Sequence, residues 1–121
     1  MRNYKDLLLG QKAHTLTLMV YKGTQRFPIE ERYGLTSQIR RACASVPANL
    51  AEGCGRRSEG EMARFIQIAM GSGADLSYHL LLARDLGFLS TADCTNLDSE
   101  LSAVMRMLSS LSQKIRTSLA S

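Results

Sequence analysis

The sequence predicts an all-α protein that folds as an up-down antiparallel four-helix bundle. Apolar residues recur at intervals of three and four residues in four separate segments, which is the spacing of an amphipathic helix. No segment alternates polar and apolar residues between turns as a strand does, and the joints between the four segments are short, which favours antiparallel neighbours. A length of 121 residues suits one core, so we expect a single domain over residues 1–121.

The first helix is predicted from about Tyr4 to Gln25. Its apolar positions are less regular than those of the other helices: Tyr4, Leu8, Leu9, Ala13, Leu16 and Val20. The pair Phe27-Pro28 then interrupts the pattern, because a proline disfavours helical geometry in the residue before it.

The second helix is predicted from Leu35 to Gly53, with a stripe formed by Leu35, Ile39, Cys43, Val46 and Leu50. Pro47 lies inside it. A proline there removes one helical hydrogen bond and crowds the carbonyl group of Cys43. Because the stripe keeps its phase through Pro47, we expect a helix that is kinked but continuous.

The third helix begins at a capping box of Ser58 and Glu61 and ends near Gly87, which suits a left-handed C-cap. One face is predicted to carry Met62, Phe65, Ala69, Ser72, Leu76, Leu80 and Ala83. The run Gly71-Ser72-Gly73 lies in the middle, where each glycine costs about 1 kcal/mol relative to alanine. We therefore expect a neighbouring helix to cross closely at this point.

The fourth helix, from about Thr91 to Ser118, has the most regular pattern. A heptad-like seam runs through Leu97, Leu101, Val104, Leu108, Leu111 and Ile115. Ser90 or Thr91 can cap its start, and Asp93 lies favourably in its first turn.

The sequence contains no pattern typical of an active site. His14 and His79 fall on different helices outside any metal-binding motif, and we expect His79 to be a hydrogen-bonded histidine at the edge of the core. Cys43, Cys54 and Cys94 lack the spacing of a zinc site and are interpreted as packing residues. We therefore predict no catalytic residues, no cofactor and no bound metal.

The charge favours a nucleic-acid or acidic partner. The formal net charge is +4, and eleven arginines stand against four lysines. Arginine forms two-pronged contacts with phosphate groups, and a helix N-terminus also attracts anions. The alternative is an ordinary solubilising surface. The nucleic-acid-binding candidates are Arg56 and Arg57, just before the third helix, together with Arg40, Arg41 and Arg64.

A polar strip about 80° wide runs beside the apolar stripe of the second helix. It contains Gln38, Arg41, Ser45, Asn49 and Glu52. We expect its residues to hold helices or subunits together, although a solvated face is the alternative. The candidates for structural or oligomer-interface roles are Gln38, Ser45, Pro47, Asn49, Glu52, Gly71, Ser72 and Asp75.

One long stretch resembles a known family. The run FPIEERYGLTSQIRRACASVPANLAEGCGRRSEGEMARFIQIAMGS, with YKDLLLGQKA before it and LLLARDLGFL after it, resembles the bacterial four-helix-bundle protein family, which includes proteins encoded in intervening sequences of the 23S ribosomal RNA gene. It is also similar to the accessory variability determinant of diversity-generating retroelements. The resemblance covers about residues 4 to 115. The matching positions are Leu35, Gln38, Arg40, Arg41, Ser45, Pro47, Asn49, Glu52, Gly53, Arg57, Phe65, Ala69, Gly71 and Ser72.

The resemblance implies a four-helix protomer that assembles into a ring-shaped pentamer with a central channel, and it implies no known catalysis. In the retroelement relatives, a basic ring surface binds nucleic acid and a reverse transcriptase. This chain departs from the family at Asp75, where a glutamate is typical, and at Gly73, where a larger residue is usual. An inter-helix contact between Asp75 and an arginine is therefore in doubt.

These observations predict a non-enzymatic, homo-oligomeric protein that acts as an accessory nucleic-acid-binding protein. The alternative is an oligomeric scaffold that binds a protein partner. No apolar run is long enough to span a membrane and no signal-peptide pattern is present, so we expect a cytoplasmic protein without a membrane partner.

Overall fold

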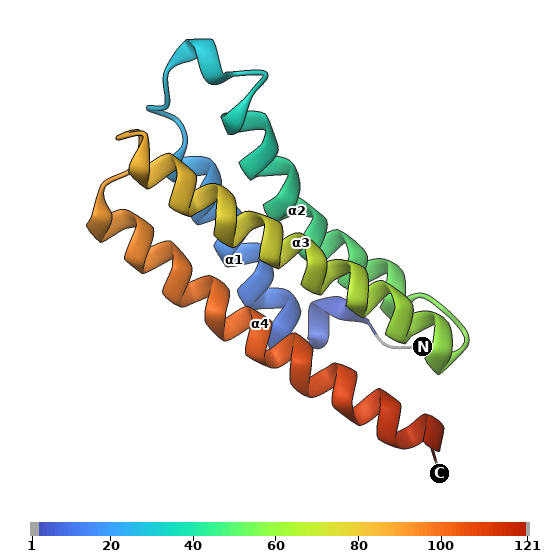
Figure 1. Ribbon diagram of the computed structural model, residues 1–121. Coiled ribbons are helices and arrows are strands. Elements are labelled where there is room, and N and C mark those ends of the chain that lie inside the picture. Colours follow the sequence, from blue (N-terminus) through green and yellow to red (C-terminus); the bar gives the residue numbers. More distant parts are fainter. Residues whose placement is uncertain (1–2, 121) are drawn as a thin grey trace.

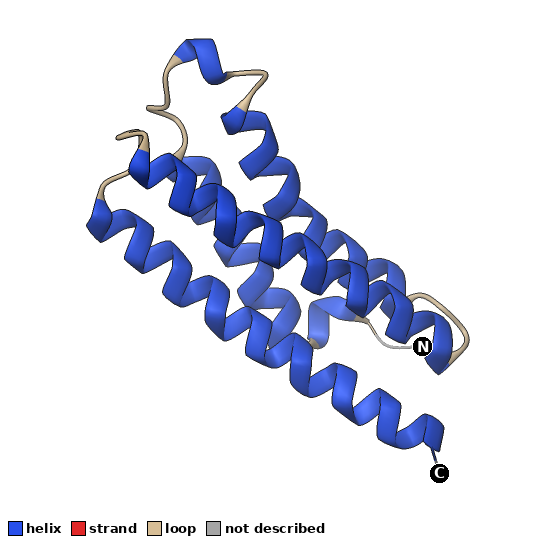
Figure 2. Cartoon of the chain, in the orientation of Figure 1, coloured by secondary structure: helices blue, strands red, loops and turns tan. Residues whose placement is uncertain are grey.

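The computed structural model describes residues 3–120 and contains four long helices packed side by side, which confirms the predicted fold class (Figure 1). They are α1 (Leu8–Gly23), α2 (Leu35–Cys54), α3 (Glu59–Asp85) and α4 (Thr91–Ala120). Contacts join α1 to α2, α2 to α3, α3 to α4 and α4 to α1, so the helices form a closed square. Residues 3–120 contain helices, turns and loops and no strand (Figure 2).

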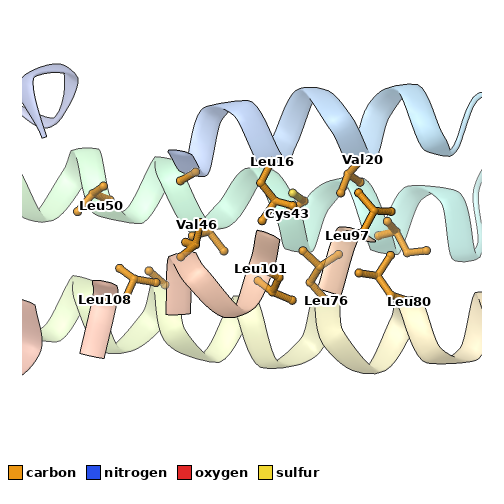
Figure 3. Close-up of a cluster of buried hydrophobic side chains, with 14 of the residues drawn as sticks. Leu16, Val20, Cys43, Val46, Leu50, Leu76, Leu80, Leu97, Leu101 and Leu108 are labelled. Atoms are coloured by element: carbon orange, nitrogen blue, oxygen red, sulfur yellow. The ribbon is translucent and has the colours of Figure 1, made fainter. Parts of the chain in front are cut away.

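All four helices contribute side chains to one core. Figure 3 shows residues of this core, among them Leu16 of α1, Val46 of α2, Leu76 of α3 and Leu101 of α4, and each of these four side chains is almost completely buried. Burying one such side chain stabilises the fold by about 1.5–3 kcal/mol. The predicted stripes of α2 and α4 are confirmed, except that Leu111 is only partly buried.

The start of α1 differs from the prediction. Residues Tyr4–Asp6 form a separate 3-10 turn (η1), Leu7 is extended, and the α-helix begins only at Leu8. Asn3 caps this turn, because its Oδ1 accepts a hydrogen bond from the backbone N–H of Lys5 at 3.1 Å. The turn folds back so closely that a Cβ atom at Gly10 would collide with the carbonyl oxygen of Tyr4.

The connection between α1 and α2 is ordered by side chains that face inward. It contains a 3-10 turn (η2, Ile29–Glu31), and the ring of Phe27 is buried with its centroid 5.8 Å from that of Phe88. Glu31 caps the start of α2, because its Oε1 accepts a hydrogen bond from the N–H of Leu35 at 2.9 Å. The connection projects beyond the neighbouring ends of α3 and α4 (Figure 1).

Helix α2 continues through Pro47 to Cys54, as the phase of its stripe predicts. Ser58 then caps α3, because its Oγ accepts a hydrogen bond from the N–H of Glu61 at 3.1 Å. At the other end, Gly87 has a positive φ of 81°, the left-handed conformation expected of a C-cap glycine.

The predicted core face of α3 is correct only in part. Ile66 and Gly73 occupy core positions, whereas Phe65 and Ser72 are half-buried at the boundary with α2. Helix α4 does cross closely at Gly73, where an added Cβ would collide with Sδ of Met105. At Gly71 the expected close crossing by another helix of the described chain is absent, because an added Cβ would meet nothing within 4 Å.

Helix α4 begins as predicted, with Oγ of Ser90 accepting a hydrogen bond from the N–H of Asp93 at 3.0 Å. None of the helices in the described part of the chain is long and apolar enough to cross a membrane.

Candidate functional site

The two histidines are not brought together. His14 is exposed on α1, and His79 is half-buried on α3. The expected hydrogen bond is absent at Nδ1 of His79, which is buried and has no hydrogen-bond partner among the described residues. Within residues 3–120, no cluster of three or more histidine, cysteine or acidic side chains could hold a metal ion.

The three cysteines are buried, as the prediction of packing residues requires. Burial raises the pKa of the Cys43 thiol to about 11, although the neighbouring Thr17 hydroxyl acts in the opposite direction. Burial also raises the pKa of the Cys94 thiol, against the effect of the positive charge of Arg84. Both thiols therefore stay protonated at neutral pH, where the thiolate is the reactive form.

Part of the polar strip ties α2 to α3. The hydroxyl groups of Ser45 and Ser72 share a hydrogen bond of 2.8 Å, and Nδ2 of Asn49 donates to Oγ of Ser45 at 2.9 Å and to its carbonyl oxygen at 2.8 Å. This network satisfies polar groups that would otherwise be costly to place at the interface. The Ser45–Ser72 bond joins two helices of one chain, and Asn49 supports Ser45 from within α2.

The other candidates for structural or oligomer-interface roles lie outside that network. Gln38, Gly71 and Asp75 are exposed, and no ion pair joins Asp75 to an arginine in the part of the chain that the structure describes. Glu52 pairs with Arg56 one helical turn further along, with a distance of 3.0 Å between Oε2 and Nη2.

Arg40 is a structural residue. Its Nε donates a hydrogen bond to Oγ1 of Thr24 at 2.8 Å, and its Nη2 donates to the carbonyl oxygen of Tyr21 at 3.2 Å. The guanidinium carbon also lies 4.7 Å from the centroid of the Tyr21 ring. Arg40 thus fastens the start of α2 to the end of α1, and its guanidinium is already occupied.

The predicted arginines near the start of α3 surround one aromatic ring. The guanidinium carbons of Arg56 and Arg64 lie 4.8 and 4.9 Å from the centroid of the Phe65 ring. Arg57 is exposed in the short loop just before α3, and Arg41 is exposed on α2. Neither Arg41 nor Arg57 forms an ion pair within the described residues.

The structure separates these arginines into two groups. Arg40 and Arg41 lie near the start of α2, about 20 Å by helical rise from its end, where Arg56, Arg57 and Arg64 gather. Within one chain the candidate arginines therefore lie at both ends of α2. Residues 52–64, which we call the α2–α3 turn, carry three glutamates as well as three arginines, so this segment has no net charge.

Sequence reasoning missed a second basic segment. Residues 21–41, which we call the α1–α2 corner, carry five basic and two acidic side chains. Tyr33 in this segment is 88% exposed, and Tyr21 is also exposed. The available signal was the alternation of tyrosine with basic residues in YKGTQRFPIEERYG, a combination typical of nucleic-acid-binding surfaces.

An open groove of about 600 Å³ runs between η1, α1 and α2. Small or apolar residues and polar side chains both line it. The lining residues are Tyr4, Lys5, Gly10, Gln11, His14, Thr17, Ala44, Pro47, Ala48 and Ala51. Pro47 thus contributes to an exposed surface as well as to α2.

The fold and its surface define a four-helix-bundle protein whose polar features lie on exposed helix faces and in the loops. A family model described as "23S rRNA-intervening sequence protein" matches residues 5–110. The chain therefore belongs to the 23S rRNA-intervening sequence protein family.

A solved structure has the same fold. It is a protein of unknown function from the S23 ribosomal protein family of Bacteroides thetaiotaomicron, with a TM-score of 0.76 and 17% sequence identity. The similarity covers 86% of this chain and 97% of that chain. No curated protein matches the sequence.

Proposed function

We propose that this chain is a non-enzymatic protein that binds nucleic acid and assembles with copies of itself. The observation that carries the proposal is a net charge of +4 with two unpaired, outward-facing arginines, Arg41 and Arg57, on α2 and before α3. Such cations attract the phosphate backbone whatever the base sequence, because they displace counterions condensed on the nucleic acid.

Arg57 is well placed for a phosphate. It lies two residues before the first residue of α3, where the free N–H groups and the helix dipole already favour an anion. Arg56 and Arg64 contribute less, because their guanidiniums lie against Phe65 and Arg56 is paired with Glu52. With one free and two partnered arginines among the described residues, the start of α3 suits a weak contact with the phosphate backbone of a nucleic acid.

Self-assembly is supported by Gly71. A glycine in the middle of a helix costs about 1 kcal/mol relative to alanine, and no neighbour within the chain requires one at this position. Close approach of a second subunit would account for it, with the exposed side chain of Asp75 one helical turn further along α3. The family resemblance supports a ring of five subunits.

The binding experiment is light-scattering mass with and without a structured RNA, at two salt concentrations. We expect an oligomer that gains mass with RNA at low salt and releases it at high salt. The double variant Arg41→Ala/Arg57→Ala should bind more weakly, with a smaller salt dependence. The control, Arg84→Ala/Arg106→Ala, removes the same charge elsewhere and should bind like the wild type. Equal loss in both variants would remove Arg41 and Arg57 as specific contacts.

The assembly experiment compares two exposed glycines of α3. Gly71→Leu should lower the oligomeric mass, because a large side chain would block the proposed subunit contact. Gly60 also has nothing within 4 Å of an added Cβ, so Gly60→Leu is a matched control and should assemble normally. A wild-type chain that stays monomeric, or a Gly71→Leu variant that assembles fully, would contradict this part of the proposal.

The alternative function is a scaffold for a protein partner, and the groove between η1, α1 and α2 is the observation that favours it. Small side chains such as Ala44 and Ala48 allow close approach of a partner helix. An oligomer that ignores RNA at low salt would favour this alternative over nucleic-acid binding.

A further inference from the structure

The α1–α2 corner exposes an aromatic ring that the fold does not use. Tyr33 is 88% exposed, more than any other large apolar or aromatic side chain of the described chain. Its one ring contact is with Arg32, whose guanidinium carbon lies 5.9 Å from the ring centroid. Most of the ring surface is therefore available to a ligand.

Basic side chains outnumber acidic ones in the segment that carries this ring. The basic side chains of the α1–α2 corner are Lys22, Arg26, Arg32, Arg40 and Arg41, against Glu30 and Glu31. Glu31 already accepts a hydrogen bond from the start of α2. Lys22 and Arg26 line an open groove of about 500 Å³ between the end of α1 and the start of α4, together with one carboxylate, Asp93, and the amide side chains of Gln25 and Asn96.

The corner is held in one shape from within. Thr24 is 3% exposed, donates its hydroxyl hydrogen to the carbonyl oxygen of Val20, and accepts a hydrogen bond from Arg40. Phe27 is buried against Phe88, so the connection is anchored at its middle. A surface ordered before binding loses less entropy when a ligand arrives.

We propose that the α1–α2 corner binds single-stranded nucleic acid by stacking an unpaired base on Tyr33 while its exposed basic side chains, Lys22, Arg26, Arg32 and Arg41, contact the phosphates. In a duplex the base faces are covered by their neighbours, whereas an unpaired base can stack on an aromatic ring or an arginine plane. The inference rests on the proposed function, because it assumes that the chain binds nucleic acid. It adds a stacking ring to the phosphate contacts and a preference for unpaired strands.

The test is fluorescence anisotropy with a labelled 12-nucleotide oligouridine and a labelled 12-base-pair RNA duplex. Tyr33→Ala should weaken binding of the single strand on the order of tenfold, with the salt slope unchanged, since it removes stacking and no charge. Tyr33→Phe should bind like the wild type. Arg26→Ala/Arg32→Ala should weaken binding and flatten the salt slope of the single strand by about 1.

The control is Tyr78→Ala, which removes another exposed tyrosine, on α3, and should leave binding unchanged. Tyr33 is too exposed for its loss to unfold the chain, so a binding defect would reflect the surface itself. Single-strand binding that survives Tyr33→Ala and Arg26→Ala/Arg32→Ala but falls in Arg57→Ala would overturn the inference and leave the proposed function intact. A wild-type chain that binds neither RNA would overturn both. Loss of oligomeric mass in Tyr33→Ala would assign Tyr33 to a subunit interface, against the inference.

Discussion

The α1–α2 corner and the α2–α3 turn lie at the two ends of α2 and use arginine in different ways. The α2–α3 turn carries three arginines and three glutamates; Arg56 pairs with Glu52, and the guanidiniums of Arg56 and Arg64 rest on Phe65. In the α1–α2 corner, basic residues outnumber acidic ones, Arg40 is held in the joint by its hydrogen bonds, and Tyr33 extends into solvent.

The difference teaches that the number of arginines in a segment does not by itself indicate a binding surface. A guanidinium that already has a carboxylate or an aromatic ring as partner must give up part of that contact before it can bind a phosphate. The α1–α2 corner offers charge in excess of its partners and an aromatic ring without a packing role. We therefore expect changes in the corner to affect nucleic-acid binding more than changes in the turn.

The largest expected change in the free energy of unfolding comes from substituting Phe27. Phe27→Ala removes a buried ring that anchors the corner and should lower the free energy of unfolding by about 3 kcal/mol. Phe65→Ala, next to the α2–α3 turn, should lower the free energy of unfolding by less, because Phe65 is only half-buried. Chemical denaturation of both variants gives the two values, and a greater loss at Phe65 would contradict the proposed difference in anchoring.

A smaller effect is expected at Arg40 and its neighbour. Arg40→Ala removes two hydrogen bonds and a ring contact between α1 and α2, which should lower the free energy of unfolding by about 1–2 kcal/mol. Arg41→Ala should change it by less than about 0.5 kcal/mol, because Arg41 is an exposed surface residue. Equal denaturation midpoints would show that Arg40 does not fasten the joint.

The smallest of the three effects is expected at the cap of the turn. Ser58→Ala removes the hydrogen bond to the N–H of Glu61 and should lower the free energy of unfolding by about 1 kcal/mol. Single-strand binding of this variant should match that of the wild type, since the α1–α2 corner is untouched. The exposed Ser109 on α4 provides a control, Ser109→Ala, that should leave both quantities unchanged. A binding loss specific to Ser58→Ala would place the single-strand site at the turn instead.

The fold could be predicted almost completely because its helices are marked by periodic apolar residues and by local caps. The seam of α4 and the cap at Ser58 are local signals, and both are present in the structure. The break at Leu7 could not be predicted, because it depends on the 3-10 turn η1 folding back over Gly10. This brings Tyr4 against Gly10, six residues further on, which the apolar pattern does not indicate. The exchange of Phe65 for Ile66 in the core shows that a stripe alone leaves its phase uncertain by one residue.

The candidate site was less predictable, since each arginine's availability depends on its partners. Arg40 and Arg41 are neighbours in sequence, yet one is held by Thr24 and the other is exposed. Those partners lie on another helix, so no local pattern separates the two. Tyr33 was overlooked for the opposite reason, because a tyrosine in a loop carries no sign in the sequence of whether it packs inward or faces solvent.

The most direct test of the α1–α2 corner is photo-crosslinking of a single-stranded RNA that contains 4-thiouridine, followed by mass spectrometry of the crosslinked peptides. We expect the crosslink to fall on Tyr33 or on the basic residues beside it, and to disappear when unlabelled single strand competes. Crosslinks confined to residues 52–64, or distributed evenly over the surface, would contradict the assignment of the unpaired base to the corner.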